Sequence, residues 1–367
     1  MIRLLTPEVP PATDWLSYLD ESYETGIFSN FGPNARALAR EMADGVEGGR
    51  HACMTSSATT GLSAVLLALG IRGKVGVPSF TFPATASAVF QAGATPEGLE
   101  VDPDTWELDI AALDARLAQG GIAAVIHVRS FGYCRSLDAV EQVCARHDVP
   151  MIVDAAAAYG GVEPDGRPVG LRGVAEVMSL HATKPLAAGE GGVVLAQPEL
   201  IGEVEKAINF SLAGGAAADR WGLNAKMSEF SAAVGRAALV RLPQVMAARQ
   251  AQAALWATLL SDIDGVVLPR GHGTPPWQLY AFRLPGRDAQ TVQQALARAG
   301  AQSRVYYSPT VASRWRDAAA CPVADALSHD MLSLPMGRHL TSDDQHRVAG
   351  WLADILADVP VCESTAP

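Results

Sequence analysis

The sequence is poor in positive charge and has no cluster of Lys and Arg. It holds 28 Lys and Arg against 39 Asp and Glu, which gives a formal net charge of -11, and its isoelectric point is near 5.2. A chain of this charge repels the phosphate backbone of nucleic acids unless a local basic patch compensates. We therefore expect no nucleic-acid partner.

The sequence also lacks a long apolar run. No stretch approaches the roughly 18 consecutive apolar residues that a membrane-spanning helix needs. The first residues, MIRLLTP, contain too short an apolar run for a secretory signal peptide. We expect a cytoplasmic protein with no membrane partner.

Cysteine is scarce, and its spacing suits neither a disulfide framework nor a zinc site. An odd number of cysteines without a C-x-x-C pair argues against both. The thiols are therefore expected to be reduced, most of them as small buried hydrophobes, and no metal site or cysteine nucleophile is predicted. The five cysteines are Cys53, Cys134, Cys144, Cys321 and Cys362.

What the sequence does contain is a pattern of short apolar runs alternating with amphipathic stretches, from about Phe28 to Ala196. This pattern is typical of an α/β fold with a mostly parallel sheet flanked by helices. The clearest unit is a strand at 123–127, a helix at 137–147 that Ser136 would cap, and a strand at 150–154. Further strands are expected at 74–77, 175–180 and 192–196.

The length of 367 residues predicts two domains, because one hydrophobic core usually stops growing below this size. A long Ala-rich helical segment at about 227–260 contains Pro243, which should end or kink it. We place the junction there, between a large domain at 1–245 and a small α+β domain at 246–367. The small domain should hold a strand at 277–284 and helices at 289–299 and 343–356, followed by a loose tail at 362–367.

Two segments could bind a planar phosphorylated ligand. Small hydroxyl residues at 54–62 open an apolar helix, and a helix N-terminus with Ser and Thr donors suits a phosphate, although an ordinary N-cap explains them too. The segment 78–85 follows a strand and carries Phe80 and Phe82, either of which could stack on a planar ring or belong to the core.

Two ionisable residues follow apolar strands, where ligands bind in such sheets. Asp154 stands before four alanines, and its carboxylate needs a partner there: a protonated pyridine nitrogen, a structural salt bridge or a helix N-cap. Lys184 lies in the apolar, Gly-bounded segment 179–192, where desolvation would lower its pKa and free the amine for imine formation. Most lysines are instead solvated surface charges.

Taken together and in order, these segments resemble the DegT/StrS family of sugar aminotransferases, which are fold-type-I enzymes that use pyridoxal 5'-phosphate. The family's S-F-H-x-x-K segment is similar to S-L-H-A-T-K at 179–184, and G-E-G-G follows at 189–192. By this resemblance Lys184 forms the Schiff base with the cofactor and carries the proton. The E-D-A-A-Q-A segment of the family is similar to V-D-A-A-A-A at 153–158, so Asp154 contacts the pyridine nitrogen.

The resemblance also implies which residues make the other contacts to the cofactor. The family's T-F or T-W pair matches Thr81 and Phe82, which assigns ring stacking to Phe82. Its S-N-A-T segment matches 56–59 and assigns the phosphate to Ser57, Ala58 and Thr59, with Ser179 in reach. One departure is Ala157, which occupies the place of the Gln or His that the family usually has near the ring.

The segment 222–229 resembles the family's G-x-N-x-R-M-x-E, whose Asn contacts the phosphate bound by the neighbouring subunit. The resemblance therefore implies a homodimer with shared sites, to which Asn224 contributes. It extends to 28–33 and 332–336 and so covers nearly the whole chain. The substrate-facing residues that it indicates are His181, Arg304, Tyr306 and Tyr307, although Thr310 and Val311 stand where the family often has a His.

The function that this resemblance implies is transfer of an amino group from L-glutamate to a nucleotide-linked keto sugar, in deoxyaminosugar biosynthesis for a surface polysaccharide or a glycosylated metabolite. Ala157 and the segment around Tyr306 leave open a family member with altered chemistry, either a dehydratase or an aminotransferase for a non-sugar ring. Lys184 disfavours the dehydratase, because sugar dehydratases of the family carry His instead. A catalytically silent protein that binds pyridoxal phosphate is the third alternative.

Overall fold

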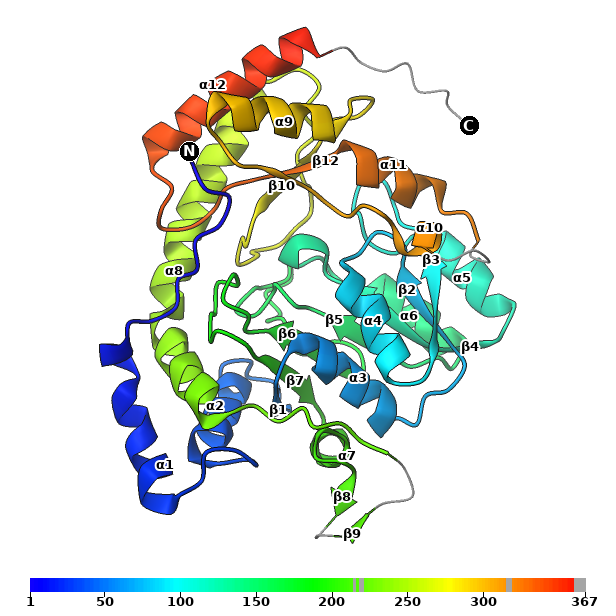
Figure 1. Ribbon diagram of the computed structural model, residues 1–367. Helices are drawn as coiled ribbons and strands as arrows, with labels where there is room; N and C mark the ends of the chain where they lie inside the picture. The colour runs from blue at the N-terminus through cyan, green and yellow to red at the C-terminus, as the bar shows by residue number, and fades with distance from the viewer. Residues whose placement is uncertain (214–215, 218–220, 315–318, 360–367) are drawn as a thin grey trace.

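The computed structural model describes residues 1–213, 216–217, 221–314 and 319–359 (Figure 1). Cys362 and the tail expected at 362–367 lie outside the described residues. In the described part of the chain, no helix is both long and apolar enough to cross a membrane. Its cysteines, Cys53, Cys134, Cys144 and Cys321, are buried and free of disulfides, as the sequence indicated.

A seven-stranded sheet forms the centre of the molecule, in the order β1-β7-β6-β5-β4-β2-β3. β7 pairs antiparallel with both of its neighbours, and all other pairs are parallel, so the expected mostly parallel mixed sheet is confirmed. The strands are β1 (His51–Thr55), β2 (Lys74–Pro78), β3 (Thr95–Leu99), β4 (Ile122–Val128), β5 (Met151–Asp154), β6 (Ala175–Ser179) and β7 (Gly192–Ala196).

Helices cover both faces of this sheet, because its strands are apolar on both sides. In β4, Val125 packs into the core on one face while its neighbour Ile126 packs into the core on the other. The first face is covered by α2 (Pro33–Asp44), α5 (Ile110–Ala118), α6 (Asp138–Arg146) and the start of α8 (Glu229–Ser261). The second face is covered by α3 (Ala58–Ala68), α4 (Pro83–Gln91) and α7 (Pro198–Ile208).

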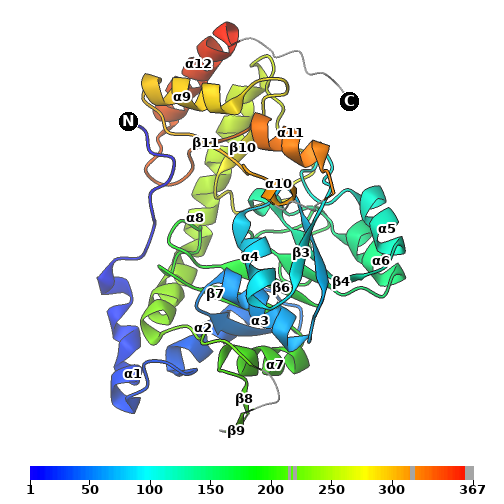
Figure 2. The same cartoon turned by 45° about the vertical axis from the view of Figure 1, so that its right-hand side comes forward.

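A smaller sheet and its helices form the C-terminal part of the molecule, which lies at the top of Figure 1 and of the turned view in Figure 2. Its antiparallel order is β10-β12-β11, with β10 (Tyr280–Arg283), β11 (Arg304–Val305) and β12 (Met331–Leu334). The helices around it are α9 (Ala289–Ala299), α10 (Val311–Arg314), α11 (Pro322–Asp330) and α12 (Ser342–Asp358). The remaining elements are α1 (Asp20–Thr25), the 3-10 turns η1 (Ala12–Asp14), η2 (Leu16–Leu19) and η3 (Ser130–Gly132), and the short pair β8 (Leu212–Ala213) and β9 (Ala216–Ala217).

The helix α8 connects the two parts. Leu242 belongs to the core under the large sheet, whereas Trp256 and Leu260 belong to the core of the small one. Pro243 does not end the helix, which continues to Ser261, although its path bends part-way along (Figure 1). Burial of apolar residues on either side offsets the hydrogen bond that a proline removes. The proposed domain boundary at 245/246 therefore falls inside one helix and stays a prediction.

Two expected boundaries are wrong in detail. Leu137, not Ser136, is the N-cap of α6, and Ser136 Oγ accepts a 3.3 Å bond from the Asp138 amide and a 3.5 Å bond from Arg172. The strand expected at 277–284 is reduced to β10, because Trp277 has a φ of 53°, outside the extended region.

Candidate active site

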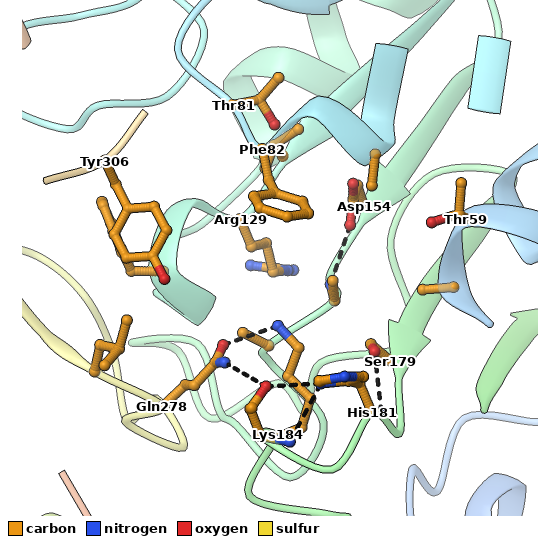
Figure 3. A pocket seen from close by; sticks show the side chains of 18 of the residues that line it. Thr59, Thr81, Phe82, Arg129, Asp154, Ser179, His181, Lys184, Gln278 and Tyr306 are labelled. Atoms are coloured by element: carbon orange, nitrogen blue, oxygen red, sulfur yellow. Dashed lines mark hydrogen bonds between the residues drawn. The ribbon is translucent and has the colours of Figure 1, made fainter. Parts of the chain in front are cut away.

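A cavity of about 390 Å³ lies where β4, β5 and β6 end, between the large sheet and the small one. Every pocket residue that the sequence indicated on the chain's own side lines this cavity. They are Ser57, Ala58, Thr59, Phe82, Asp154, Ser179, His181, Lys184, Arg304, Tyr306 and Tyr307. Figure 3 shows ten of the lining side chains by name, with Lys184 and Gln278 on one side of the space and Thr59 and Asp154 on another.

One wall of the cavity is the N-terminus of α3. Ser57 is the N-cap, and its hydroxyl accepts a 3.2 Å bond from the Thr60 amide in a capping box. The first amides of a helix have no acceptor within the helix, and the helix dipole favours an anion there. The ordinary cap is therefore present, and it does not use the free first amides of α3, so the anion site at this helix start stays a prediction.

Gly192 holds that helix start against the sheet. A Cβ on Gly192 would lie 2.5 Å from both the Ala58 amide nitrogen and the Ser57 carbonyl carbon, closer than real Cβ contacts come. Only glycine lets β7 approach the first turn of α3 this closely. Gly192 therefore fixes how close the first amides of α3 lie to β7.

Asp154 is the last residue of β5 and is 6% exposed. Its carboxylate accepts a 2.7 Å bond from Thr85 Oγ1 and a 3.1 Å bond from the Ala156 amide. Burial raises its pKa, against the two hydrogen bonds and the positive charge of Lys184. Among the described residues no ion pair to Asp154 is present, so this carboxylate fits a cationic partner that a bound ligand would bring.

The amine of Lys184 lies in the opposite wall. The lysine follows β6 in a turn closed by a 2.8 Å bond from its amide to the His181 carbonyl. Its Nζ donates a 2.8 Å bond to Gln278 Oε1, which is neutral. Burial lowers the pKa of Lys184 to about 8, although Asp154 opposes this shift. A larger fraction of this amine than of an ordinary lysine is therefore neutral near physiological pH, and the neutral form is the one that nucleophilic attack requires.

The two phenylalanines of the segment 78–85 have different places. Phe80 is fully buried and its ring meets the edge of Tyr307 at 5.0 Å. Phe82 is 53% exposed and lines the cavity. An aromatic side chain that is half exposed in a cavity is available to stack on a planar ligand, whereas Phe80 serves the core.

Of the expected substrate-side residues, Arg304, Tyr306 and Tyr307 come from β11 and the segment after it, whereas His181 follows β6. The Arg304 guanidinium lies 5.0 Å from the centre of the Tyr306 ring, and Tyr307 stacks on Phe131 at 5.3 Å. His181 Nδ1 is 2.9 Å from Thr183 Oγ1, and its Nε2 is 3.6 Å from Glu190 Oε1. This side of the cavity is therefore aromatic and carries one guanidinium, which suits a ring-shaped or anionic substrate.

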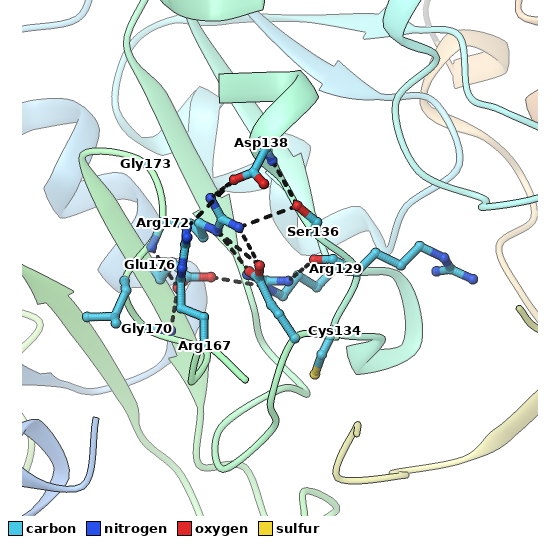
Figure 4. A network of polar contacts seen from close by, with 12 residues as sticks. Arg129, Cys134, Ser136, Asp138, Arg167, Gly170, Arg172, Gly173 and Glu176 are labelled. Carbon is cyan, nitrogen blue, oxygen red and sulfur yellow. Dashed lines mark hydrogen bonds and ion pairs between the residues drawn. The ribbon is translucent and has the colours of Figure 1, made fainter. Parts of the chain in front are cut away.

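Gln278 and Arg129 are polar side chains of the cavity that the sequence analysis did not identify. Gln278 comes from the segment before β10, and Arg129 follows β4. Arg129 is anchored in a buried network in which it donates to Glu163 at 2.6 Å and to Glu176 at 3.0 Å, while Arg172 bonds the same Glu163 (Figure 4). No local motif marks either residue, because their roles arise from contacts between distant segments.

Asn224 does not line the cavity of its own chain. It is exposed, pairs with Asn209 in a β-bridge and accepts a 2.8 Å bond from Lys226 Nζ. The contact that the family resemblance implies for it, to a phosphate in a neighbouring subunit, stays a prediction.

Comparisons with known proteins agree with this geometry. The sequence model of the DegT/DnrJ/EryC1/StrS aminotransferase family matches residues 12–353 of this chain. The erythromycin biosynthesis sensory transduction protein EryC1 of Saccharopolyspora erythraea is 32% identical over 333 residues, covering 88% of this chain and 90% of that protein. A UDP-2-acetamido-2-deoxy-3-oxo-D-glucuronate aminotransferase of Pseudomonas aeruginosa is 29% identical over 323 residues, covering 84% and 87%.

Among solved structures, that of DesI in the presence of its TDP-sugar product superposes with a TM-score of 0.89 at 32% identity, covering 96% of this chain and 93% of DesI. The donor set of the cavity fits pyridoxal phosphate: a helix N-terminus suits its phosphate, a buried carboxylate with no ion pair among the described residues suits its pyridinium, and a lysine amine of lowered pKa suits its aldehyde. The chain therefore belongs to the DegT/DnrJ/EryC1/StrS aminotransferase family, whose members depend on pyridoxal phosphate.

Proposed function

We propose that this aminotransferase moves an amino group from L-glutamate to a nucleotide-linked keto sugar, with Lys184 and Asp154 as its catalytic residues. The observation that carries the proposal is one cavity that joins a lysine amine of lowered pKa to a buried carboxylate that has no ion pair in the described part of the chain. DesI with its TDP-sugar product and the UDP-sugar aminotransferase of P. aeruginosa support the acceptor class.

Some residues of the chain hold the cofactor, and others control the position of protons. Bound pyridoxal phosphate supplies an electron sink for the carbon that carries the amino group. Asp154 keeps a proton on the ring nitrogen, since its carboxylate would otherwise lie buried without a cation. Lys184 Nζ takes the proton from the donor carbon and returns it at the adjacent position, acting as base and then as acid.

The remaining cavity residues fix the positions of the cofactor and the substrates. Ser57, Ala58, Thr59 and Ser179 hold the phosphate at the start of α3, and Phe82 stacks on the ring face. Fixing both ends of the cofactor keeps the reacting carbon within reach of one lysine. On the substrate side, Arg304 binds an anionic group, either the donor carboxylate or the diphosphate of the acceptor, and His181, Tyr306 and Tyr307 border the sugar.

The site is completed by a second copy of the chain, and Asn224 of that copy reaches the phosphate. Asn224 is exposed, and exposed aromatic side chains support a contact face: Trp221 is 93% exposed, and Phe230, which stacks on Phe28 at 5.8 Å, is 47% exposed. A mixture of Lys184→Ala and Asn224→Ala chains tests this arrangement. Recovery of activity on mixing supports shared sites, and the absence of recovery contradicts them.

Lys184→Ala tests the function itself. The protein is loaded with pyridoxal phosphate and given L-glutamate, and 2-oxoglutarate is measured. We expect stoichiometric 2-oxoglutarate from the unchanged chain and from the control Lys206→Ala, whose lysine lies exposed on α7, but none from Lys184→Ala. A Lys184→Ala protein that still forms 2-oxoglutarate would remove Lys184 from the mechanism.

The acceptor is identified in the second half of the reaction. The aminated form of the protein is offered a panel of nucleotide-linked keto sugars, and products are read by mass. An aminated sugar supports the proposal. A protein that forms no 2-oxoglutarate but dehydrates a sugar would instead be the dehydratase that Lys184 disfavours. A coloured protein that no amino donor changes would be the silent cofactor-binding protein.

A further inference from the structure

The amine of Lys184 makes one hydrogen bond in the described part of the chain, and its acceptor comes from the other half of the molecule. Gln278 Oε1 accepts it at 2.8 Å. The Gln278 Nε2 group donates in turn to Thr183 Oγ1 at 3.4 Å, so the amide spans Lys184 and the residue before it (Figure 3). The side chain of Ala157, in the same cavity, offers neither donor nor acceptor.

The backbone that presents Gln278 is strained and tightly held. Its neighbour Trp277 has a φ of 53°, a conformation that costs of order 1 kcal/mol or more for a bulky residue. Trp277 is 4% exposed, stacks on Tyr280 at 5.3 Å, and its indole donates a 2.9 Å bond to Gln250. Strained residues that many contacts hold in place cluster at functional sites.

Arg249 fixes the same segment from α8. It is 2% exposed and donates a 2.8 Å bond to the Trp277 carbonyl and a 3.4 Å bond to the Gln278 carbonyl. Its charge is balanced by Glu8, 2.7 Å away. The Gln278 side chain thus extends from a backbone that two elements immobilise.

We propose that Gln278 is the positioning residue for Lys184. Its amide holds the amine of the free enzyme toward the cavity, and it gives this amine a hydrogen bond that the side chain of Ala157 cannot make. The inference rests on the proposed role of Lys184. A glutamine suits this task better than a carboxylate, because a neutral acceptor orients the amine without adding a second negative charge to that of Asp154.

The effect of the neutral Gln278 acceptor on the protonation of Lys184 can be measured on the protein without its cofactor. Lys184 is acylated with acetic anhydride over a range of pH, and the extent is read by peptide mass spectrometry. Three variants are compared with the unchanged chain: Gln278→Leu, Gln278→Glu, and the control Gln119→Leu at an exposed position after α5. Only the neutral amine reacts, so the midpoint of the pH profile reports the protonation of Lys184.

We expect Gln278→Leu to lower the midpoint by about one pH unit, because the lost hydrogen bond is stronger to the charged amine. Gln278→Glu should raise it by at least as much, and Gln119→Leu should leave it unchanged. Unchanged midpoints in both Gln278 variants overturn the inference. A midpoint that rises in Gln278→Leu also overturns it, because Asp154 and not Gln278 would then be holding the amine.

A kinetic measurement separates positioning from substrate contact. With cofactor and L-glutamate, Gln278→Leu should lower kcat by about tenfold or more while KM stays unchanged. A raised KM at unchanged kcat would make Gln278 a substrate contact and overturn the inference. Acylation needs neither cofactor nor substrate, so this inference and the proposed function fail in separate experiments.

Discussion

Replacing Asp154 with asparagine should stabilise the cofactor-free protein while disabling it. The carboxylate is buried with two hydrogen bonds but no ion pair among the described residues, and a buried charge that is only partly compensated costs about 2 kcal/mol. An asparagine keeps the bond from Thr85 to its carbonyl oxygen but turns an NH2 group toward the Ala156 amide, which loses about 1 kcal/mol. The expected net gain in the free energy of unfolding is therefore about 1 kcal/mol at neutral pH.

The pH dependence identifies the cause of this gain. The pKa of the Asp154 carboxyl is higher in the folded protein than in the unfolded chain. The contribution of this carboxyl to stability is therefore fully present below its pKa in the unfolded chain and is lost as the pH rises through its pKa in the folded protein. The advantage of Asp154→Asn should therefore vanish near pH 4, about the pKa of an unfolded aspartate, and grow as the pH rises from there to neutral. Urea unfolding of both cofactor-free proteins at the two pH values measures it, with Asp264→Asn at an exposed position as control.

The same variant should lose the formation of 2-oxoglutarate from L-glutamate, because a neutral amide cannot retain a proton on the pyridine nitrogen. Two results would refute this reasoning. One is an unchanged or lower free energy of unfolding at neutral pH. The other is a gain of equal size near pH 4, since that would place its origin in packing and not in the buried charge.

Three further perturbations address other parts of the cavity. Gly192→Ala should weaken cofactor binding by at least tenfold in a spectroscopic titration, because its Cβ would displace the first turn of α3; unchanged affinity would contradict the proposed phosphate contact. Phe82→Ala should weaken cofactor binding by roughly tenfold yet change stability by less than about 1 kcal/mol, since the ring is 53% exposed; a large loss of stability in urea would make it a core residue. Glu163→Gln should destabilise the protein by about 3–5 kcal/mol in urea unfolding, because two buried guanidinium groups lose the carboxylate that they share; a loss below about 1 kcal/mol would mean that their other partners, Glu176 beside Arg129 and Asp138 and Glu141 beside Arg172, balance them.

Much of the fold could be predicted because its central strands are apolar on both faces and short. β4, β5 and β7 lie within a residue or two of their expected ranges. The edge strands were missed for a physical reason. β3 reads T-P-E-G-L, with a proline and a glycine that disfavour a strand, and it is tolerated because an edge strand leaves part of its backbone unpaired.

The site could be predicted where its residues follow one another along the chain. Lys184 and its glycines form a local pattern, and so do the hydroxyl residues before α3. Gln278 could not be found this way, since it lies 94 residues from Lys184 and the segment that carries it was expected to be an ordinary strand. Its backbone leaves the extended region at Trp277, which no local propensity indicates for a bulky aromatic residue.

The course of α8 links the surroundings of Lys184 to those of Gln278. Its first half is packed under the sheet that carries Lys184, and its second half carries Arg249, which donates hydrogen bonds to the Trp277 and Gln278 carbonyls. Pro243 lies between these halves and removes one hydrogen bond of the helix. The hydrogen bond between the Lys184 amine and the Gln278 amide therefore joins two parts of the molecule that this one proline-containing helix also holds together.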